Sequence, residues 1–239
     1  MDGMAGKTLG LRLFAVAFFL AWTLFTLYPR PTDLVRSVYR VFNPPVDAEY
    51  AAAFSHVFTD MDLNDAVAIE AGVKEAFPYQ YDWVTYNVPW YFPTVEEAFE
   101  RMAGDCKTQL LVLASMLEAR GIPYTISVSP THVWVEYEGK RTNRIENAQV
   151  AMFTAPGAGG TPAESSVSDL FRLPAELDLA RSFEVFWIAF WHYMPADRKV
   201  SLAVGLMISL VLFAIAGTRI PEVTVVSPLP APRRAVHLR

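Results

Sequence analysis

The sequence predicts an α+β domain, with a helical half followed by an antiparallel sheet, held between two transmembrane helices. Apolar runs lie near both ends of the chain, at residues 9–27 and 200–216. Between them, apolar residues recur at helical spacing up to residue 120, and alternating strand patterns follow over 124–137. Hydrophobic residues make up 53% of the 239 residues, and the excess over a typical soluble protein lies in the two runs.

Few polar residues interrupt the apolar runs, chiefly Arg12 in the first and Ser201 and Ser209 in the second. The second run has 17 residues, at the lower end of the roughly 17–25 that cross a bilayer. A signal peptide is the alternative for the first run, but no small-x-small cleavage site follows it. We therefore expect residues 1–29 to form an uncleaved N-terminal anchor and residues 200–217 a C-terminal transmembrane helix.

The segment after the first run, 30–45, contains prolines and is expected to leave the membrane with one short helix. Three further helices are expected before residue 103, at 48–58, 64–77 and 94–102. The last of these opens with a capping box, in which Thr94 and Glu97 each bond the backbone N–H of the other. An irregular aromatic stretch, 79–92, separates the second helix from the third.

Residues 106–120 form the most complete helical pattern, which Gly121 ends and Pro123 stops. Its first residue, Cys106, is the only cysteine of the chain, so it cannot form an intrachain disulfide. The unpaired backbone N–H groups and the helix dipole at this position favour a thiolate, and Lys107 adds a nearby positive charge. An inert core cysteine is the alternative for a residue type that is so often buried.

Two strands are expected after this helix, at Tyr124–Val128 and at 132–137, with 141–147 returning as a third after a turn at 139–140. The second strand opens on His132 and places Trp134 and Glu136 on the same face. A thiol, an imidazole and a polar orienting group thus follow in chain order, which is the set of groups used by a cysteine nucleophile activated by histidine. The alternative for this polar face is ordinary solvation.

The third member of this set is Glu146 or Asn147, depending on the hairpin loop. Directly paired residues share a face, so a two-residue loop places Asn147 beside His132, and a three-residue loop ending in Gly139 places Glu146 there. Either side chain can accept the imidazole N–H and fix its tautomer. The candidate catalytic residues are therefore Cys106, His132, Glu146 and Asn147.

Residues 79–148 carry motifs in an order that resembles the transglutaminase-like superfamily, a papain-related group. The motifs are Tyr81-Asp82, Pro93 through Phe99, Gly104-Asp105-Cys106, Arg120-Gly121-Ile122-Pro123 and His132-Val133-Trp134-Val135-Glu136. The resemblance implies a papain-like core, with N-terminal helices, a nucleophile helix and an antiparallel sheet. It also implies thiol-dependent hydrolysis or acyl transfer at amides without a cofactor. The family usually has Asp where aligning Ile145 with the preceding hydrophobic position places Glu146, and this alignment favours Glu146 over Asn147.

Composition limits the other classes of function. The net charge is −5 and no basic stripe is present, which argues against a nucleic-acid partner. A single cysteine and four scattered histidines give no zinc-binding spacing, and no calcium loop or phosphate-binding loop is visible, so we expect neither metal nor cofactor. The expected partners are the lipid bilayer and a peptide or protein substrate, and a membrane protein is a further candidate.

The predicted organisation is an anchor, a transglutaminase-like domain over 30–180, an interfacial aromatic helix over 181–199, the second transmembrane helix and a disordered basic tail over 218–239. The expected function is that of a membrane-anchored amide hydrolase or acyltransferase acting on a peptide or envelope substrate. The alternative is a non-catalytic binding or scaffolding module. Six basic residues flank the runs on each side, so charge does not orient the chain. The signal-anchor character of the first run favours cytoplasmic termini and an extracytoplasmic domain.

Overall fold

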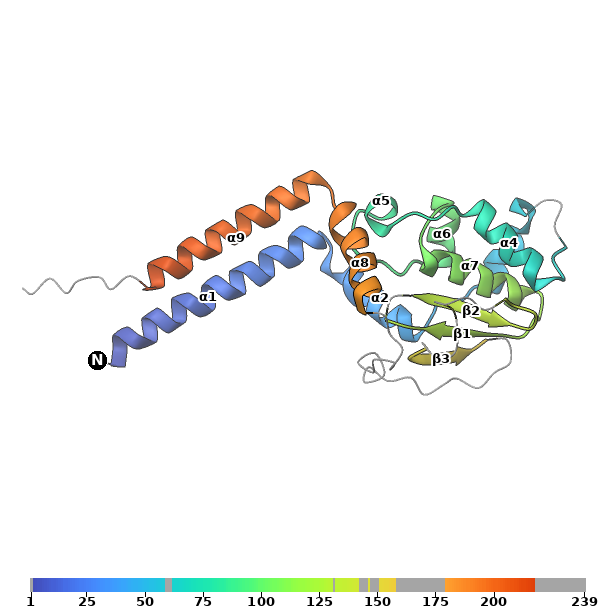
Figure 1. Ribbon diagram of the computed structural model, residues 1–239, viewed down its shortest axis with the longest axis horizontal. Coiled ribbons are helices and arrows are strands. Elements are labelled where there is room, and N and C mark those ends of the chain that lie inside the picture. Colours follow the sequence, from blue (N-terminus) through green and yellow to red (C-terminus); the bar gives the residue numbers. More distant parts are fainter. Residues whose placement is uncertain are drawn as a thin grey trace, which may run out of the picture.

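The computed structural model describes residues 2–58, 62–130, 132–141, 146, 151–157 and 179–217. They form an α+β domain from which two long helices lead away (Figure 1). The α-helices are α1 (Asp2–Leu27), α2 (Pro31–Phe42), α3 (Ala48–Ala53), α4 (Ala66–Ala76), α5 (Asp82–Thr85), α6 (Val95–Arg101), α7 (Cys106–Ala119), α8 (Leu179–Trp187) and α9 (Ala196–Gly217). The strands are β1 (Tyr124–Val128), β2 (Val133–Tyr137) and β3 (Phe153–Pro156). The expected α+β class is therefore confirmed.

Two helices are long and apolar enough to cross a membrane, at Thr8–Leu27 in α1 and Ala196–Ala216 in α9. They match the two expected runs, although α9 begins at Ala196 and so includes residues 196–199, which we had assigned to the interfacial helix. The polar residues Asp197, Arg198 and Lys199 lie in its first turn. Pro195 directly precedes the helix, and no proline separates these polar residues from the apolar part that follows, so they are helical as well.

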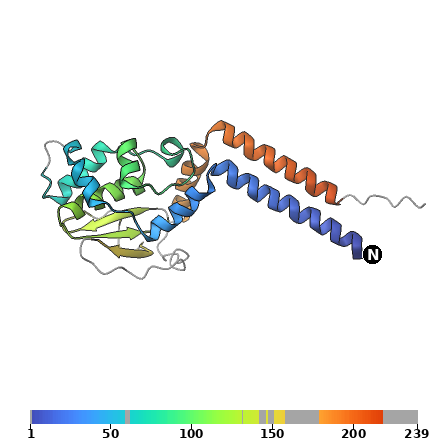
Figure 2. The ribbon, with the colours of Figure 1, turned by 180° about the vertical axis from the view of Figure 1, so that it is seen from behind.

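The two long helices lie side by side in both views (Figures 1 and 2). The indole of Trp22 donates to the Ser201 carbonyl oxygen over 2.8 Å, and the hydroxyls of Thr26 and Ser201 lie 2.9 Å apart. Arg198 Nη1 donates to the Thr26 carbonyl oxygen over 2.8 Å. A side chain at Gly205 would overlap the Trp22 ring, so the glycine allows this close approach. The polar contacts gather at the end of the pair next to the domain.

Helix α7 is the centre of the domain. It packs against both β1 and β2 on one side and against α3, α4 and α6 on the other. Ten of its fourteen residues are consequently buried, including every residue from Leu110 to Leu117. A helix that is covered on all sides is apolar around most of its circumference, as this segment is.

The sheet has the order β2-β1-β3, and both pairings are antiparallel. Ile126 of β1 lies opposite Val135 of β2 and opposite Ala155 of β3. The third described strand therefore pairs with β1, not with β2. Its four residues are too few for a clear alternation in the sequence. Most of the expected strand 141–147 lies outside the described residues.

The helices before α7 largely follow the sequence. The predicted helix 48–58 is divided into α3 and a 3-10 turn at Ser55–Val57, and the predicted helix 64–77 is α4. The capping box between Thr94 and Glu97 is confirmed at the start of α6. The aromatic stretch expected to be irregular contains the short helix α5. Helices α4 to α7 lie on one side of the sheet (Figure 1).

Two hydrogen bonds join the domain to the end of the helix pair. Tyr28, just after α1, donates its hydroxyl to the Trp90 carbonyl oxygen over 3.1 Å, and its ring packs with Val88 and Tyr91. A second connection reaches the segment before α9, where Trp83 Nε1 donates to the Phe190 carbonyl oxygen over 2.8 Å. Both connections tie the segment before α6 to the helices that lead into the apolar spans.

Helix α8 and the π-helical segment Ile188–His192 lie at the junction between the domain and the long helices (Figure 1). Their aromatic side chains are largely exposed in the described structure, which is a pattern typical of the membrane–water boundary. These side chains are those of Phe183, Phe186, Trp187 and Trp191. The expected basic tail, 218–239, lies outside the described residues.

Candidate active site

Cys106 begins α7 because the preceding residues hold the chain in a fixed turn. The Gly104 N–H donates to the Pro78 carbonyl oxygen over 3.2 Å, and the Gln80 N–H donates to the Gly104 carbonyl oxygen over 2.9 Å. A side chain at Gly104 would collide with Thr108, so this approach requires glycine. Asp105 then caps the helix by accepting the Lys107 N–H over 3.0 Å. The thiol is therefore placed at the N-terminus of a buried, capped helix.

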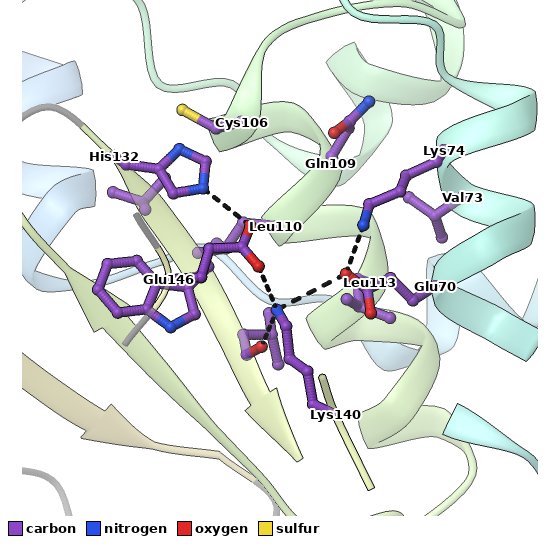
Figure 3. Close-up of a pocket in the computed structure, with 13 residues that line it drawn as sticks. Glu70, Val73, Lys74, Cys106, Gln109, Leu110, Leu113, His132, Lys140 and Glu146 are labelled. Atoms are coloured by element: carbon purple, nitrogen blue, oxygen red, sulfur yellow. Dashed lines mark hydrogen bonds and ion pairs between the residues drawn. The ribbon is translucent and has the colours of Figure 1, made fainter. Parts of the chain in front are cut away.

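His132 lies directly before β2 and is held by Ser129. The Ser129 hydroxyl accepts the His132 N–H and donates to the His132 carbonyl oxygen, each over 3.0 Å. The Ser129 N–H donates to the same carbonyl oxygen over 2.8 Å. The imidazole stacks on the Trp134 ring at 5.9 Å and lies beside the Cys106 thiol (Figure 3). Backbone and ring are thus both fixed before any substrate binds.

Glu146 completes the group. Its Oε1 lies 2.9 Å from His132 Nε2 (Figure 3). Burial alone would lower the pKa of His132, but its interactions with Cys106 and Glu146 outweigh burial and raise this pKa to about 9. The hydrogen bond with His132, opposed by burial and assisted by Lys140, lowers the pKa of Glu146 to about 2. Imidazolium and carboxylate therefore coexist at neutral pH. Asn147, the other candidate, lies outside the described residues.

Lys140 is a member of the site that sequence reasoning missed. Its Nζ lies 3.3 Å from Glu146 Oε2 and 3.6 Å from Glu70 Oε1, and it donates to the Val135 carbonyl oxygen over 2.6 Å (Figure 3). Only 4% of its side chain is exposed. In the sequence it follows Gly139 and was assigned to a turn, and no local pattern distinguishes a buried lysine from a solvated one at such a position.

A second buried cluster lies on the other side of Cys106. Lys107 Nζ lies 2.9 Å from Asp82 Oδ2 and also binds Asp105. Burial would lower the pKa of Lys107, but the two carboxylates raise it well above its usual value. Burial and the charge of Asp105 raise the pKa of Asp82. Two carboxylates thus share the Lys107 charge, and the expectation that this charge favours a thiolate at Cys106 stays a prediction.

The polar face of β2 is not a solvated surface. Trp134 is 2% exposed, and its Nε1 donates to Glu136 Oε1. The face is instead part of the structure around His132, because the Trp134 ring forms the wall on which the imidazole stacks. Glu136 satisfies the indole N–H and does not contact the imidazole in the described structure.

Cys106 and His132 lie between two cavities. The smaller, of about 30 Å³, is bordered by Glu70, Lys140 and Glu146, among others, and is large enough for a water molecule. The larger, of about 600 Å³, extends to the end of α1. Among the described residues, no group of three or more His, Cys, Asp or Glu side chains is placed to hold a metal ion.

Searches of protein-family models, of curated proteins and of solved structures find no significant match to this chain. The site is therefore interpreted from its own geometry and chemistry.

We expect Glu146→Gln to lower the pKa of His132, because the amide cannot balance an imidazolium charge as a carboxylate does. An imidazole NMR titration should place the wild-type ring near 9 and the variant lower. Glu136→Gln changes a carboxylate on β2 that does not contact the ring, and it should leave the titration of His132 unchanged. An unchanged titration in Glu146→Gln would show that the pair does not exist in solution.

The same pair sets a pH dependence of stability. The raised pKa of His132 stabilises the fold fully below 6.5, its ordinary pKa, and this stabilisation is lost as pH rises through about 9. The stabilisation from the lowered pKa of Glu146 is fully present above pH 4.5 and is lost as pH falls through about 2. The stability difference between wild type and Glu146→Gln should therefore be largest between pH 4.5 and 6.5 and decline on either side.

Lys140→Met should lower the free energy of unfolding by about 1–3 kcal/mol, because it leaves Glu70 and Glu146 without their shared cation. Lys74→Met is the matched control, since Lys74 also pairs with Glu70 but is 56% exposed, and its loss should cost no more than about 0.5 kcal/mol. Denaturant titration of the two full-length variants measures the difference. Equal losses in both would contradict a structural role for Lys140.

Proposed function

We propose that this chain is a cysteine-dependent amide hydrolase or acyltransferase of the transglutaminase-like superfamily. The observation that carries the proposal is the position of the His132 ring, which lies beside the Cys106 thiol and binds the Glu146 carboxylate with its Nε2. A protonated imidazole next to a thiol at a helix N-terminus favours the thiolate, which is the reactive form. The order of the sequence motifs from Tyr81 to Glu136 supports the superfamily assignment.

The proposed reaction begins from the thiolate and imidazolium. Cys106 Sγ attacks the carbonyl carbon of the amide, and the oxyanion that forms accepts hydrogen bonds from backbone N–H groups at the start of α7. The C–N bond then breaks, and the amine leaves with the proton of His132, so that a thioester and a neutral imidazole remain.

The second half of the reaction releases the acyl group. Water, or an acceptor amine, attacks the thioester carbon while His132 takes its proton. The C–S bond breaks, the acid or new amide leaves, and the thiolate and imidazolium are restored. Glu146 stays ionised throughout and orients the ring. Lys140, held by Glu146 and Glu70, positions Glu146.

Alkylation of Cys106 tests the proposed pair directly, because no other cysteine of the chain can react. A free thiol is only about 1% thiolate at pH 6.5, so an activated Cys106 should react with iodoacetamide at least about tenfold faster than glutathione at this pH. His132→Ala should bring the rate down to that of a free thiol. His56→Ala, which changes an exposed histidine outside the site, should not. A slow wild-type reaction would favour a non-catalytic binding module.

We further propose that α1 and α9 anchor the chain in a cell membrane with the domain on the extracytoplasmic side. The supporting features are the two apolar spans and the positively flanked first span, which resembles a signal anchor. The ends of α1 and α9 at Asp2 and Gly217 lie away from the domain (Figure 1), so in the proposed topology they are on the opposite side of the bilayer from it.

Protease added to intact cells or spheroplasts should degrade the domain and leave an N-terminal epitope tag protected. Protection of the domain until the membrane is ruptured would reverse the orientation. Recovery of the protein in the soluble fraction after cell lysis without detergent would exclude the membrane anchor. Immunoblotting against tags at residue 1 and in the domain distinguishes the three outcomes.

A further inference from the structure

The larger cavity connects the thiol to the membrane end of the domain. Cys106 and His132 line one part of it, and Leu27 and Tyr28, at the end of the first apolar span, line another. Its volume of about 600 Å³ lies within the roughly 300–1,000 Å³ typical of ligand pockets. A ligand that fills it would therefore reach from the end of α1 to the reacting group.

The walls of this cavity away from the thiol are apolar and come from separate parts of the chain. They include Val38 and Val41 of α2, Val128 of β1, Phe186 of α8, and Ala189 and Phe190 of the π-helical segment. Such walls favour an aliphatic chain, since its transfer from water gains free energy with every buried methylene. An extended peptide would bring backbone N–H and C=O groups that these walls offer no means to satisfy.

The charged residues of the lining gather around the thiol instead. Asp105 and Lys107 flank Cys106, and Asp82 binds Lys107. Asp82 is 4% exposed, and its Oδ1 has no hydrogen-bond partner among the described residues. The cavity is therefore polar where the chemistry would occur and apolar toward the membrane.

Helix α8 and the π-helical segment Ile188–His192 give this cavity a route from the bilayer. Val185, Phe186, Ala189 and Phe190 form one side of the cavity, and Phe186 is also among the exposed aromatic side chains of α8. The other boundary, Leu27, is the last residue of the first span. An apolar chain can thus pass from the hydrocarbon region to the cavity between groups that are themselves apolar, without an exposed intermediate in water.

We propose that the larger cavity binds an acyl chain of a membrane lipid, with the acyl carbonyl at Cys106. The chemistry of this inference rests on the proposed function, but the binding of the acyl chain does not. In the covalent step, Cys106 Sγ attacks the ester or amide carbonyl carbon and the C–O or C–N bond breaks. The alcohol or amine leaves with the proton of His132, and water then hydrolyses the thioester as in the general reaction.

Chain binding is tested without the nucleophile, in full-length Cys106→Ala protein in lipid nanodiscs that contain a phosphatidylcholine with a diazirine at the end of one acyl chain. Photocrosslinks should map to α2 around Val38 and to residues 185–190. Adding Val38→Trp fills the cavity and should reduce these crosslinks about tenfold, a loss of about 1.4 kcal/mol of binding free energy. Val35→Trp, an equal change at a 69% exposed position of the same helix, should leave them unchanged.

A second measurement locates the reacting end. N-ethyl and N-hexadecyl bromoacetamide are compared as alkylating reagents for Cys106 in nanodiscs. Val38→Trp and Ala189→Trp, which fill the cavity from opposite walls, should slow only the hexadecyl reagent, about tenfold. Val35→Trp and Ala180→Trp are the controls, since neither residue lines the cavity. Two cavity-filling variants keep the test decisive if one of them does not fold.

Each contrary result has a defined meaning. Crosslinks and hexadecyl rates that are unchanged by both cavity-filling variants would overturn the proposal. A bromoacetylated apolar peptide that becomes selectively slow in these variants, while the hexadecyl reagent does not, would overturn it in favour of a peptide site. A wild-type thiol that reacts no faster than glutathione with the ethyl reagent, together with mapped crosslinks, would remove the proposed function and retain the lipid-binding cavity.

Discussion

The burial of α7 is the constraint on which the remaining structure depends. The sheet covers one side of this helix and α3, α4 and α6 cover the other, so that neither a shift nor a rotation is possible without exposing core side chains. Full burial of a Leu or Met side chain contributes about 1.5–3 kcal/mol, and Leu111, Met116 and Leu117 are all fully buried. Only the first two residues of α7, Cys106 and Lys107, line the larger cavity. Packing of the whole domain therefore fixes the position of a single sulfur atom.

Two lysines organise the charges on either side of that sulfur atom. Lys107 is shared by Asp82 and Asp105, and Lys140 is shared by Glu70 and Glu146. Each of these lysines is thus bound by two carboxylates, and Glu70 also binds Lys74. The imidazolium of His132 is then the cation in direct contact with Cys106. The position of this imidazole is set by Ser129 and Trp134.

Much of this organisation follows from local sequence. The periodicity of 106–120, the capping box at Thr94 and the alternation in β1 and β2 depend on neighbouring residues, and the structure confirms these elements. The sequence offered Cys106, His132 and either Glu146 or Asn147; the first three lie together in the structure, and Asn147 lies outside the described residues. The pairing of β3 with β1 and the burial of Lys107 and Lys140 depend on residues distant in the chain. No periodicity records such contacts, and a lysine beside a glycine has the same local pattern whether it is buried or solvated.

The hydrogen bond from Tyr28 to the Trp90 carbonyl oxygen has a geometric consequence. With α1 and α9 in a bilayer, this bond and the one from Trp83 to Phe190 allow no flexible tether between the membrane surface and the domain. The sulfur atom would then stay at a constant height above the lipid headgroups. In the proposed function, only bonds at that height above the membrane surface come within reach of the thiol.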